Sequence, residues 1–164
     1  MLQGLAPVSL PTAKVLVLGS MPGAVSLQQQ QYYGHPRNAF WPIITELTGV
    51  VADLPYPQRL QALTSKGIAL WDVIASCERV GSLDSAIRQE QVNDFSTFFS
   101  LHPQLQAIAF NGAKAAQSFA RHVLPLQCVP NAVSLLTLPS TSPAHARLSF
   151  ADKIQQWQQV CDYL

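Results

Sequence analysis

The chain has 164 residues, of which 48% are hydrophobic and only 12% charged, and its formal net charge is +1. This length suits one domain with a sizeable core, and the composition excludes an intrinsically disordered chain. A charge this close to neutral gives no overall basic signature, so any contact with nucleic acid has to be local.

The cysteines and the N-terminal residues further limit the class of protein to which this chain can belong. Cys77, Cys128 and Cys161 are far apart and lack metal-ligand spacing, so we expect reduced thiols, no metal site and a cytoplasmic chain. The stretch from Met1 to Pro11 lacks the basic region and the continuous apolar core of a signal peptide. No apolar run approaches about 18 residues, so we expect no membrane span.

The predicted elements alternate between strands and helices along the chain. Apolar runs predict buried strands at residues 14–18, 68–73, 107–110 and 134–138. Helical patterns occur at residues 39–47, 57–65, 94–101, 113–123 and from 149 to the end. This alternation predicts one α/β domain, residues 1–164: a three-layer α/β/α sandwich around a mainly parallel four-stranded central sheet.

Particular residues are expected to start or end several of these helices. Gly49 and Gly67 follow the first two helices, as glycine often does at a helix C-terminus. Asn93 is placed to cap the third helix. Ser149, with Asp152 three residues later, forms a capping-box pattern at the start of the last helix.

The polar loops of this topology gather at one edge of the sheet. Open α/β sheets bind ligands outside the carboxyl ends of their strands. The loops that leave these ends are Ser20-Met21-Pro22, Ala75-Ser76-Cys77, Asn111-Gly112 and residues 139–145. We therefore expect the functional site at this edge.

The segment 19–41, directly after the first strand, carries most of the candidate chemistry. It opens with a tight turn that lacks the lysine of a P-loop and the spacing of a dinucleotide fingerprint. An aromatic face, amide groups and a cation can hold a planar, polar ring such as a nucleobase. The side chains that offer them are Tyr32, Tyr33, His35, Arg37, Asn38, Phe40 and Trp41. A purely structural turn and solvated side chains at 35 and 37 are the alternatives.

Three further polar residues have both a structural and a ligand-binding interpretation. Asn38 directly precedes a predicted helix, so it is either an N-cap or an amide that holds a water or a base edge. Asp72 lies in a buried strand, where a carboxylate needs a partner: a neighbouring loop or a base. Asn111 opens a helix and is either its cap or a ligand contact.

The loop 139–147 offers a second group of candidates. Loops of small polar residues approach a phosphate backbone closely through hydroxyl and amide donors. An ordinary connecting loop explains its serines and prolines, but explains less well a histidine and an arginine in the same stretch. The candidate DNA contacts are Ser140, Thr141, Ser142, Pro143, Ala144, His145 and Arg147.

Together these two segments resemble the uracil-DNA glycosylase superfamily, most closely its hypoxanthine-DNA (deoxyinosine) glycosylase branch. The first motif reads GSMPG at 19–23, SL at 26–27, YYGHPRN at 32–38 and FW at 40–41. The second, PSTSPA at 139–144, resembles the DNA-intercalation loop of the family. The resemblance implies a monofunctional glycosylase that flips a deaminated base, hypoxanthine or also uracil, out of DNA. It then hydrolyses the N-glycosidic bond and leaves an abasic site.

The sequence departs from the better-known branches at Met21, where they carry an Asp or Asn that handles the attacking water. Leu138 likewise stands where they have a histidine. The resemblance to the hypoxanthine branch implies that Asn38 takes over as the catalytic residue. A weak base suffices, because an oxocarbenium-like reaction depends more on stabilising the departing base.

The resemblance also implies a role for each remaining candidate. Base contacts are expected from Ser20, Met21, Pro22, Phe40, Asp72 and Asn111, with Phe40 stacking on the base. DNA contacts are expected from His35, Arg37 and the residues of the loop 139–147. Hydrolysis by a positioned water requires no cofactor. The expected partner is double- or single-stranded DNA with a deaminated base, bound by a monomer.

Two other functions fit the same residues. An enzyme of this fold can act on free nucleosides or nucleotides, and a non-catalytic protein can bind damaged DNA. Met21 favours the non-catalytic binder, because it stands where the better-known branches carry the residue that handles the attacking water. No lysine lies in the first motif, so a Schiff-base lyase is not expected, although Lys114 leaves that open. The small side chains of the loop 139–147 predict a dependence on base pairs that are already weak.

Overall fold

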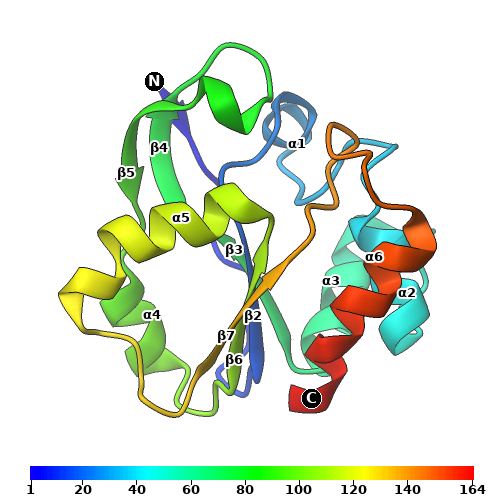
Figure 1. Cartoon of the computed structure of the whole chain (residues 1–164). Helices are drawn as coiled ribbons and strands as arrows, with labels where there is room; N and C mark the ends of the chain where they lie inside the picture. Colours follow the sequence, from blue (N-terminus) through cyan, green and yellow to red (C-terminus); the bar gives the residue numbers. More distant parts are fainter.

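A four-stranded parallel sheet forms the middle layer of the computed structural model, which describes residues 1–164 (Figure 1). Its strands lie in the order β3-β2-β6-β7, and every neighbouring pair is parallel. Their bounds are Val15–Gly19 for β2, Ile68–Asp72 for β3, Ala107–Asn111 for β6 and Ser134–Leu138 for β7. The strands predicted from the apolar runs are therefore confirmed, and their carboxyl ends share one edge.

Helices cover both faces of this sheet. Figure 1 shows α2, α3 and α6 on one face and α4 and α5 on the other. The bounds are Phe40–Thr48 for α2, Tyr56–Ser65 for α3, Phe95–Leu101 for α4, Ala113–His122 for α5 and Phe150–Trp157 for α6. Shorter helices, which were not predicted, are α1 at Ala24–Gln29 and the 3-10 helices at Asp84–Ala86 and Leu124–Leu126. The helix predicted from residue 149 to the end continues after α6 as a 3-10 helix at Gln158–Tyr163. No helix combines the length and hydropathy that crossing a bilayer requires.

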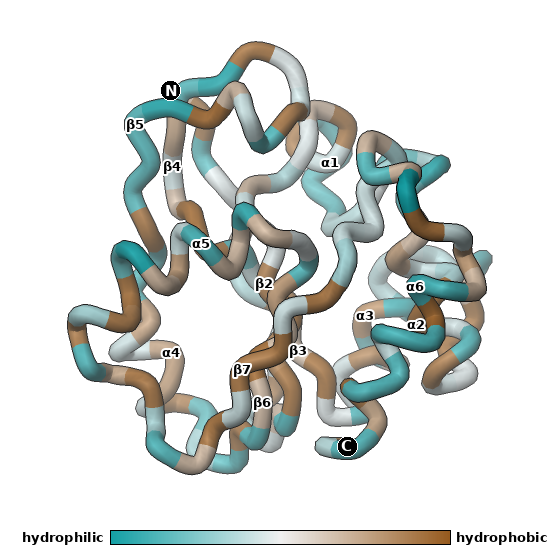
Figure 2. Tube along the Cα trace, viewed as in Figure 1, coloured by the Kyte–Doolittle hydropathy of each residue, from teal (hydrophilic) through white to brown (hydrophobic).

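The alternation of side chains along β2 divides the core into two clusters. Val15 and Val17 pack with residues of α2, α3 and α6, whereas Leu16 and Leu18 pack with residues of α4 and α5. Figure 2 shows hydrophobic residues concentrated along the strands and hydrophilic ones on the outer parts of the helices. Both faces of the parallel sheet are thus removed from water, which supplies the main driving force for this fold.

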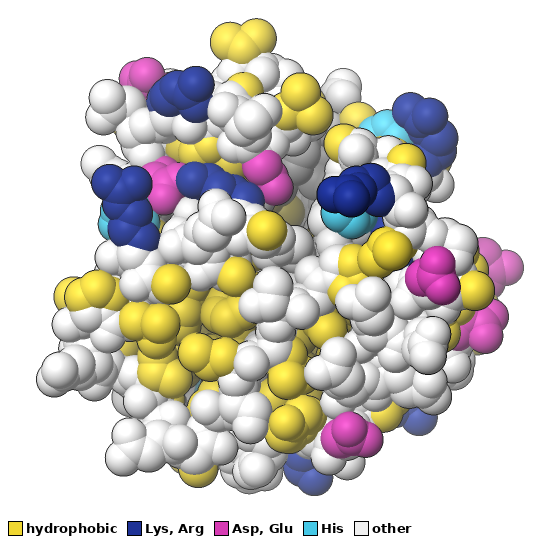
Figure 3. Space-filling model, in the orientation of Figure 1, with side chains coloured by type: hydrophobic (Ala, Val, Ile, Leu, Met, Phe, Trp, Pro, Cys, Tyr) yellow, Lys and Arg dark blue, Asp and Glu magenta, His cyan; other side chains and the backbone are white.

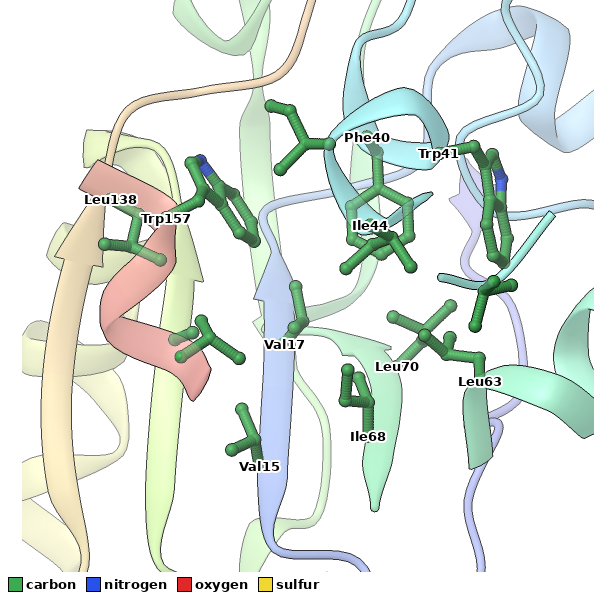
Figure 4. Packing of buried hydrophobic residues seen from close by; sticks show 14 of the residues in the cluster. Val15, Val17, Phe40, Trp41, Ile44, Leu63, Ile68, Leu70, Leu138 and Trp157 are labelled. Carbon is green, nitrogen blue, oxygen red and sulfur yellow. The ribbon is translucent and has the colours of Figure 1, made fainter. Parts of the chain in front are cut away.

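Trp157 joins the last helix to the first of these clusters. Figure 4 shows its indole, from α6, pointing toward Phe40 of α2. The two rings meet edge to face with their centroids 6.1 Å apart. Trp157 is 0% exposed, and its Nε1 donates to the carbonyl oxygen of Pro139 at 2.9 Å. The same side chain therefore fills the core and holds the start of the loop 139–147.

A second, antiparallel sheet was not predicted. Its order is β1-β4-β5, with bounds Leu2–Gln3, Ile74–Glu78 and Arg88–Val92. The expected loop at Ala75-Ser76-Cys77 was wrong, because these residues lie in β4, which follows β3 after Val73 alone. Register shifts on both sides of Ser76 interrupt the ladder with β5. The strand therefore lacks the regular alternation by which sequence reveals a half-buried strand.

The residues predicted to bound the helices are mostly confirmed. Gly49 and Gly67 adopt φ of 79° and 87° at the ends of α2 and α3, in the region that favours glycine. Ser149 caps α6 through its side chain. Asn93 was the wrong residue for α4, because the side chain of Asp94 accepts the capping hydrogen bond instead.

Replacing Trp157 tests its part in the fold. We expect Trp157→Ala to lower the free energy of unfolding by about 3–5 kcal/mol, because the substitution leaves a large cavity in the core. Phe150→Ala is the matched control, since Phe150 begins the same helix and is 44% exposed. Urea denaturation of both variants measures the difference. A loss no larger for Trp157→Ala than for the control would contradict this account.

Candidate functional site

A cavity of about 720 Å³ opens at the carboxyl edge of the parallel sheet, where the sequence placed the functional site. Its walls come from the turn after β2, the segment 32–38, the end of β3, the β4–β5 connection, the start of α5 and the loop after β7. Figure 3 shows Lys, Arg and His side chains on the upper half of this face, with Asp and Glu side chains among them. Cationic and imidazole side chains that the net charge could not reveal, Arg88, Lys114, His35 and His145, therefore line the cavity together with Asp72 and Asp84.

Most residues selected from the sequence line this cavity: Ser20, Met21, Pro22, His35, Asn38, Asp72, Asn111, Ser140, Thr141, Ser142, Pro143, Ala144 and His145. Phe40, Arg37 and Arg147 do not. The two arginines are exposed outside it, where a guanidinium remains available to a phosphate. Phe40 is buried in the core.

Tyr33, and not Phe40, presents an aromatic ring to the cavity. The two rings stack with their centroids 4.0 Å apart and 23° between their planes, and Phe40 is 0% exposed. The expected stacking of Phe40 on a base is therefore corrected: Phe40 supports Tyr33 from the core side. Tyr33 has a φ of 57°, a left-handed conformation that is uncommon for an aromatic residue. Nothing in the sequence indicates this conformation, which sets the direction of the ring.

Asn38 lies at the cavity with part of its carboxamide already bonded. Its Oδ1 accepts a hydrogen bond from the backbone N–H of Phe40 at 2.9 Å, at the start of α2. Asn38 therefore does bond to the first turn of α2, as the structural alternative for this residue expected. An amide oxygen has two lone pairs and an amide nitrogen two donors, so this bond leaves one acceptor and both N–H groups for a ligand or a water.

Asn111 and Thr141 bind one another across the floor of the cavity. Asn111 Nδ2 donates to Thr141 Oγ1 at 2.9 Å, and the Thr141 N–H donates to Asn111 Oδ1 at 2.9 Å. Thr141 is 1% exposed, so its expected contact with DNA is corrected. The expected base contact of Asn111 is restricted, since these bonds use one lone pair of its oxygen and one N–H and leave one of each. The pair instead fixes the loop 139–147 to the end of β6.

Asp72 ends β3 as a buried carboxyl group that faces the cavity. It is 4% exposed, and its Oδ2 has no hydrogen-bond partner. A Cβ at Gly19 would lie 2.5 Å from Asp72 Oδ1, so the missing side chain at 19 makes room for the carboxyl. Burial raises the pKa of Asp72 to about 7, with a further rise from Asp84 and an opposing effect from Arg79.

The turn after β2 offers few free polar side-chain groups. Met21 is 6% exposed and packs with Ile74, Cys77 and Ile87. Ser20 Oγ donates to Asp84 Oδ1 at 2.6 Å. Contacts from Ser20, Met21 and Pro22 to a ligand would therefore come mainly from the backbone and from the shape of the turn.

The sequence did not reveal the part of the cavity that follows β4. Ser82, Leu83, Asp84, Ser85 and Ile87 line it from the β4–β5 connection. The Val80-Gly81-Ser82 stretch is a turn signal, but without β4 nothing placed it near the site.

Lys114 also lines the cavity, from the start of α5. Its Nζ lies 2.7 Å from Glu90 Oε2. A nucleophilic amine has to be free to reach the sugar carbon, whereas this one is held against Glu90. The ion pair therefore argues against the Schiff-base chemistry that the sequence left open at Lys114.

The model of the uracil DNA glycosylase superfamily matches residues 7–161. The chain belongs to this superfamily. Two curated relatives, each named hypoxanthine DNA glycosylase, cover most of it. The protein from Methanosarcina barkeri is 40% identical over 116 residues, which is 70% of this chain and 73% of the relative. The protein from Methanosarcina acetivorans is 37% identical over 148 residues, which is 90% of this chain and 89% of the relative.

A solved structure shares the fold as well. The solution NMR structure of a Methanosarcina acetivorans protein, provisionally named a uracil DNA glycosylase, superimposes with a TM-score of 0.79. The two sequences are 33% identical, and the superposition covers 96% of this chain and 97% of the solved one. The resemblance inferred from the two motifs, and the glycosylase-like α/β fold that it implied, are therefore confirmed for this member of the uracil DNA glycosylase superfamily.

The bonds between Asn111 and Thr141 lead to a prediction on stability. Thr141→Val keeps the shape of the side chain but leaves Asn111 Nδ2 without its acceptor. We expect a loss of about 1–3 kcal/mol in the free energy of unfolding, because a buried amide N–H loses its partner. Ser142→Ala, the neighbouring substitution, removes only a hydroxyl that accepts from Ala144 at 3.2 Å and should cost less. Urea denaturation compares them, and equal losses would show that the bond contributes little.

Proposed function

We propose that this chain is a monofunctional DNA glycosylase that removes hypoxanthine from DNA inside the cell. In the reaction, water attacks C1′ of the nucleotide, the bond from C1′ to N9 breaks, and hypoxanthine leaves with a proton. An abasic site remains. The observation that carries the proposal is the convergence of Asn38, Tyr33 and Asp72 on one cavity at the edge of the sheet. The names of both Methanosarcina relatives support hypoxanthine as the base.

Asp72 is the residue best placed to recognise the base. Hypoxanthine carries a carbonyl oxygen next to an N–H group on its six-membered ring. A neutral carboxyl group offers the complementary pair, an O–H donor and a carbonyl acceptor, whereas a carboxylate only accepts. Burial keeps Asp72 in the neutral form up to about pH 7, as its raised pKa indicates. Its Oδ2 has no hydrogen-bond partner within the protein and is itself buried, so the contact requires the base to enter the cavity as far as this atom.

Tyr33 supplies the flat surface against which the base lies. Its ring is part of the cavity wall, and Phe40 stacks behind it at 4.0 Å, which limits its movement. Burial raises the pKa of the Tyr33 hydroxyl, so the side chain stays neutral at physiological pH. Stacking on a neutral ring does not depend on base identity, so hydrogen bonding by Asp72 has to provide the selectivity.

Asn38 is the residue proposed to hold the attacking water. Its free N–H groups can donate to the oxygen of the water, and the second lone pair of Oδ1 can accept a water hydrogen. Met21, apolar and packed into a hydrophobic cluster, cannot do so. A positioned water without a strong base is adequate where the sugar carbon becomes electrophilic early, because the bond to the base weakens first.

The DNA backbone would cross the rim of the cavity. His35, Ser140, Ser142 and His145 line its mouth, and Arg37 and Arg147 are exposed beside it. Hydroxyl, amide and guanidinium donors of this kind contact phosphates in protein–DNA complexes. The site is built from one chain, so we propose that a monomer binds double- or single-stranded DNA.

The test uses DNA with a single deoxyinosine, incubated with the protein and then cleaved with alkali. We expect strand breaks with the wild-type chain, and a single-turnover excision rate lower by about 100-fold or more for Asn38→Ala, because the water loses its positioning group. Binding to the same DNA should remain. Asn131→Ala, an exposed asparagine away from the cavity, is the matched control.

The same assay separates the alternative functions. Binding without strand breaks would indicate a non-catalytic reader of damaged DNA, and release of hypoxanthine from free deoxyinosine alone would indicate a nucleoside hydrolase. An unchanged excision rate for Asn38→Ala would remove Asn38 from the mechanism.

The role of Asp72 predicts a pH dependence. As pH rises through about 7, Asp72 ionises and loses its donor, so excision of hypoxanthine by the wild-type chain should fall. Asp72→Asn keeps a donor and an acceptor at every pH, and we expect it to retain activity with a flatter profile between pH 6 and 8.5. Any slope left in this variant belongs to groups other than Asp72. Identical profiles for the variant and the wild type would exclude a neutral Asp72.

A further inference from the structure

The β4–β5 loop, residues 79–87, carries exposed apolar side chains that the proposed chemistry does not use. Val80 is 93% exposed and Leu83 is 57% exposed. Figure 1 shows this loop at the top of the molecule, above the end of the sheet, and Figure 3 shows yellow hydrophobic side chains on the surface there. Single exposed apolar residues are common on proteins, so their exposure needs a second observation to carry meaning.

The second observation is that the chain holds this loop in place. Arg79 donates to the carbonyl oxygens of Gly81 at 2.8 Å and Pro22 at 2.7 Å. The backbone N–H of Ala24 donates to Ser82 Oγ at 2.8 Å. These bonds, together with the one from Ser20 to Asp84, attach the loop to the turn after β2. The loop therefore does not bury its apolar side chains by folding back, and keeps them in water at a fixed place.

That place is the rim of the base cavity. Leu83 itself lines the cavity, together with its neighbours Ser82 and Asp84. The β4–β5 loop and the loop 139–147 both contribute residues to the cavity wall, and Figure 1 shows them as two separate loops, the second in the orange segment before α6. DNA whose flipped base enters the cavity has to lie against both loops.

Base flipping also creates a need that the loop 139–147 meets with one compact side chain, that of Pro143. Extruding a base leaves a gap in the stack, and proteins that distort duplexes often fill such gaps with Phe, Leu, Ile, Met or Pro side chains. Beside Pro143, the loop 139–147 lines the cavity with small or polar side chains, including Ser142, Ala144 and His145. Leu83 is the large, exposed aliphatic side chain that both lines the cavity and points its surface to solvent.

We propose that Leu83 is an apolar wedge that enters the DNA base stack where the lesion is flipped out, with Val80 packing against the same duplex. This rests on the proposed glycosylase function and adds a second DNA-contacting loop to it. The wedge stabilises the flipped state on paired DNA, where the gap is flanked by stacked bases. It has no such effect on single-stranded DNA, where flipping does not open a duplex.

The experiment compares excision from a duplex with a paired deoxyinosine and from the same strand alone. We expect Leu83→Ala to lose about tenfold or more in single-turnover rate on the duplex, corresponding to about 1.4 kcal/mol, and little on the single strand. Leu83→Met, which keeps an apolar side chain of similar length, should behave like the wild type. Leu126→Ala is the matched control, because Leu126 is 67% exposed but does not line the cavity.

A second readout follows the stack directly. With 2-aminopurine next to the deoxyinosine, binding of the wild-type chain should raise fluorescence as the neighbouring base loses its stacking partner, and Leu83→Ala should raise it less. If the wild-type chain excised nothing, the proposed function would fail, while fluorescence on bound duplex would still test the wedge.

Two results would overturn the proposal. Equal losses of Leu83→Ala on duplex and single strand would mean that Leu83 only shapes the cavity. No loss on either substrate, with unchanged fluorescence, would leave this surface for a partner other than DNA.

Discussion

Two hydrogen bonds between Asn111 and Thr141 set the geometry on which the site depends. They fix the loop 139–147 to the end of β6, and the backbone oxygen of Thr141 accepts from the N–H of Ala39 at 3.0 Å. Ala39 directly follows Asn38, so the residue proposed to hold the water is connected to the loop proposed to hold the DNA. Because the pair is buried, water does not compete for these bonds, and the three segments keep one relative position.

A second constraint is the burial of Asp72 at the point where the two sheets meet. A charged carboxylate is costly at a buried position without a partner, and Asp72 Oδ2 has no hydrogen-bond partner. Position 19 is a glycine, and a Cβ there would collide with Asp72 Oδ1. Asn93 Nδ2 donates to the backbone oxygen of Asp72 at 2.8 Å, so the neighbouring chain satisfies the main chain but not the carboxyl. Such an arrangement suits a group whose partner comes from outside the protein.

The layers and the parallel sheet could be predicted from sequence because their signal is local. Long apolar runs mark strands buried on both sides, and glycines mark where α2 and α3 end. The sheet β1-β4-β5 could not be predicted, since its middle strand contains Ser76 and Cys77, follows β3 without a turn and pairs with shifted register.

The site was predicted as a set of residues rather than as an arrangement. Asn38, Asp72 and most of the loop 139–147 were selected correctly as neighbours of one cavity. The expected stacking of Phe40 on a base was wrong because Phe40 is 0% exposed and lies behind the ring of Tyr33, whose left-handed backbone no sequence pattern indicates. The pairing of Asn111 with Thr141 joins residues far apart in sequence, so only the folded chain reveals which of their polar atoms are already used.

The short passage from β3 to β4 has a mechanical consequence. Val73 alone separates the two strands, and its N–H donates to the carbonyl oxygen of Gly19 at 2.8 Å, while the N–H of Ile74 donates to that of Ser20 at 3.0 Å. These two bonds fix the base of the β4–β5 hairpin beside Asp72. The position of its tip therefore follows the direction in which β3 leaves the parallel sheet.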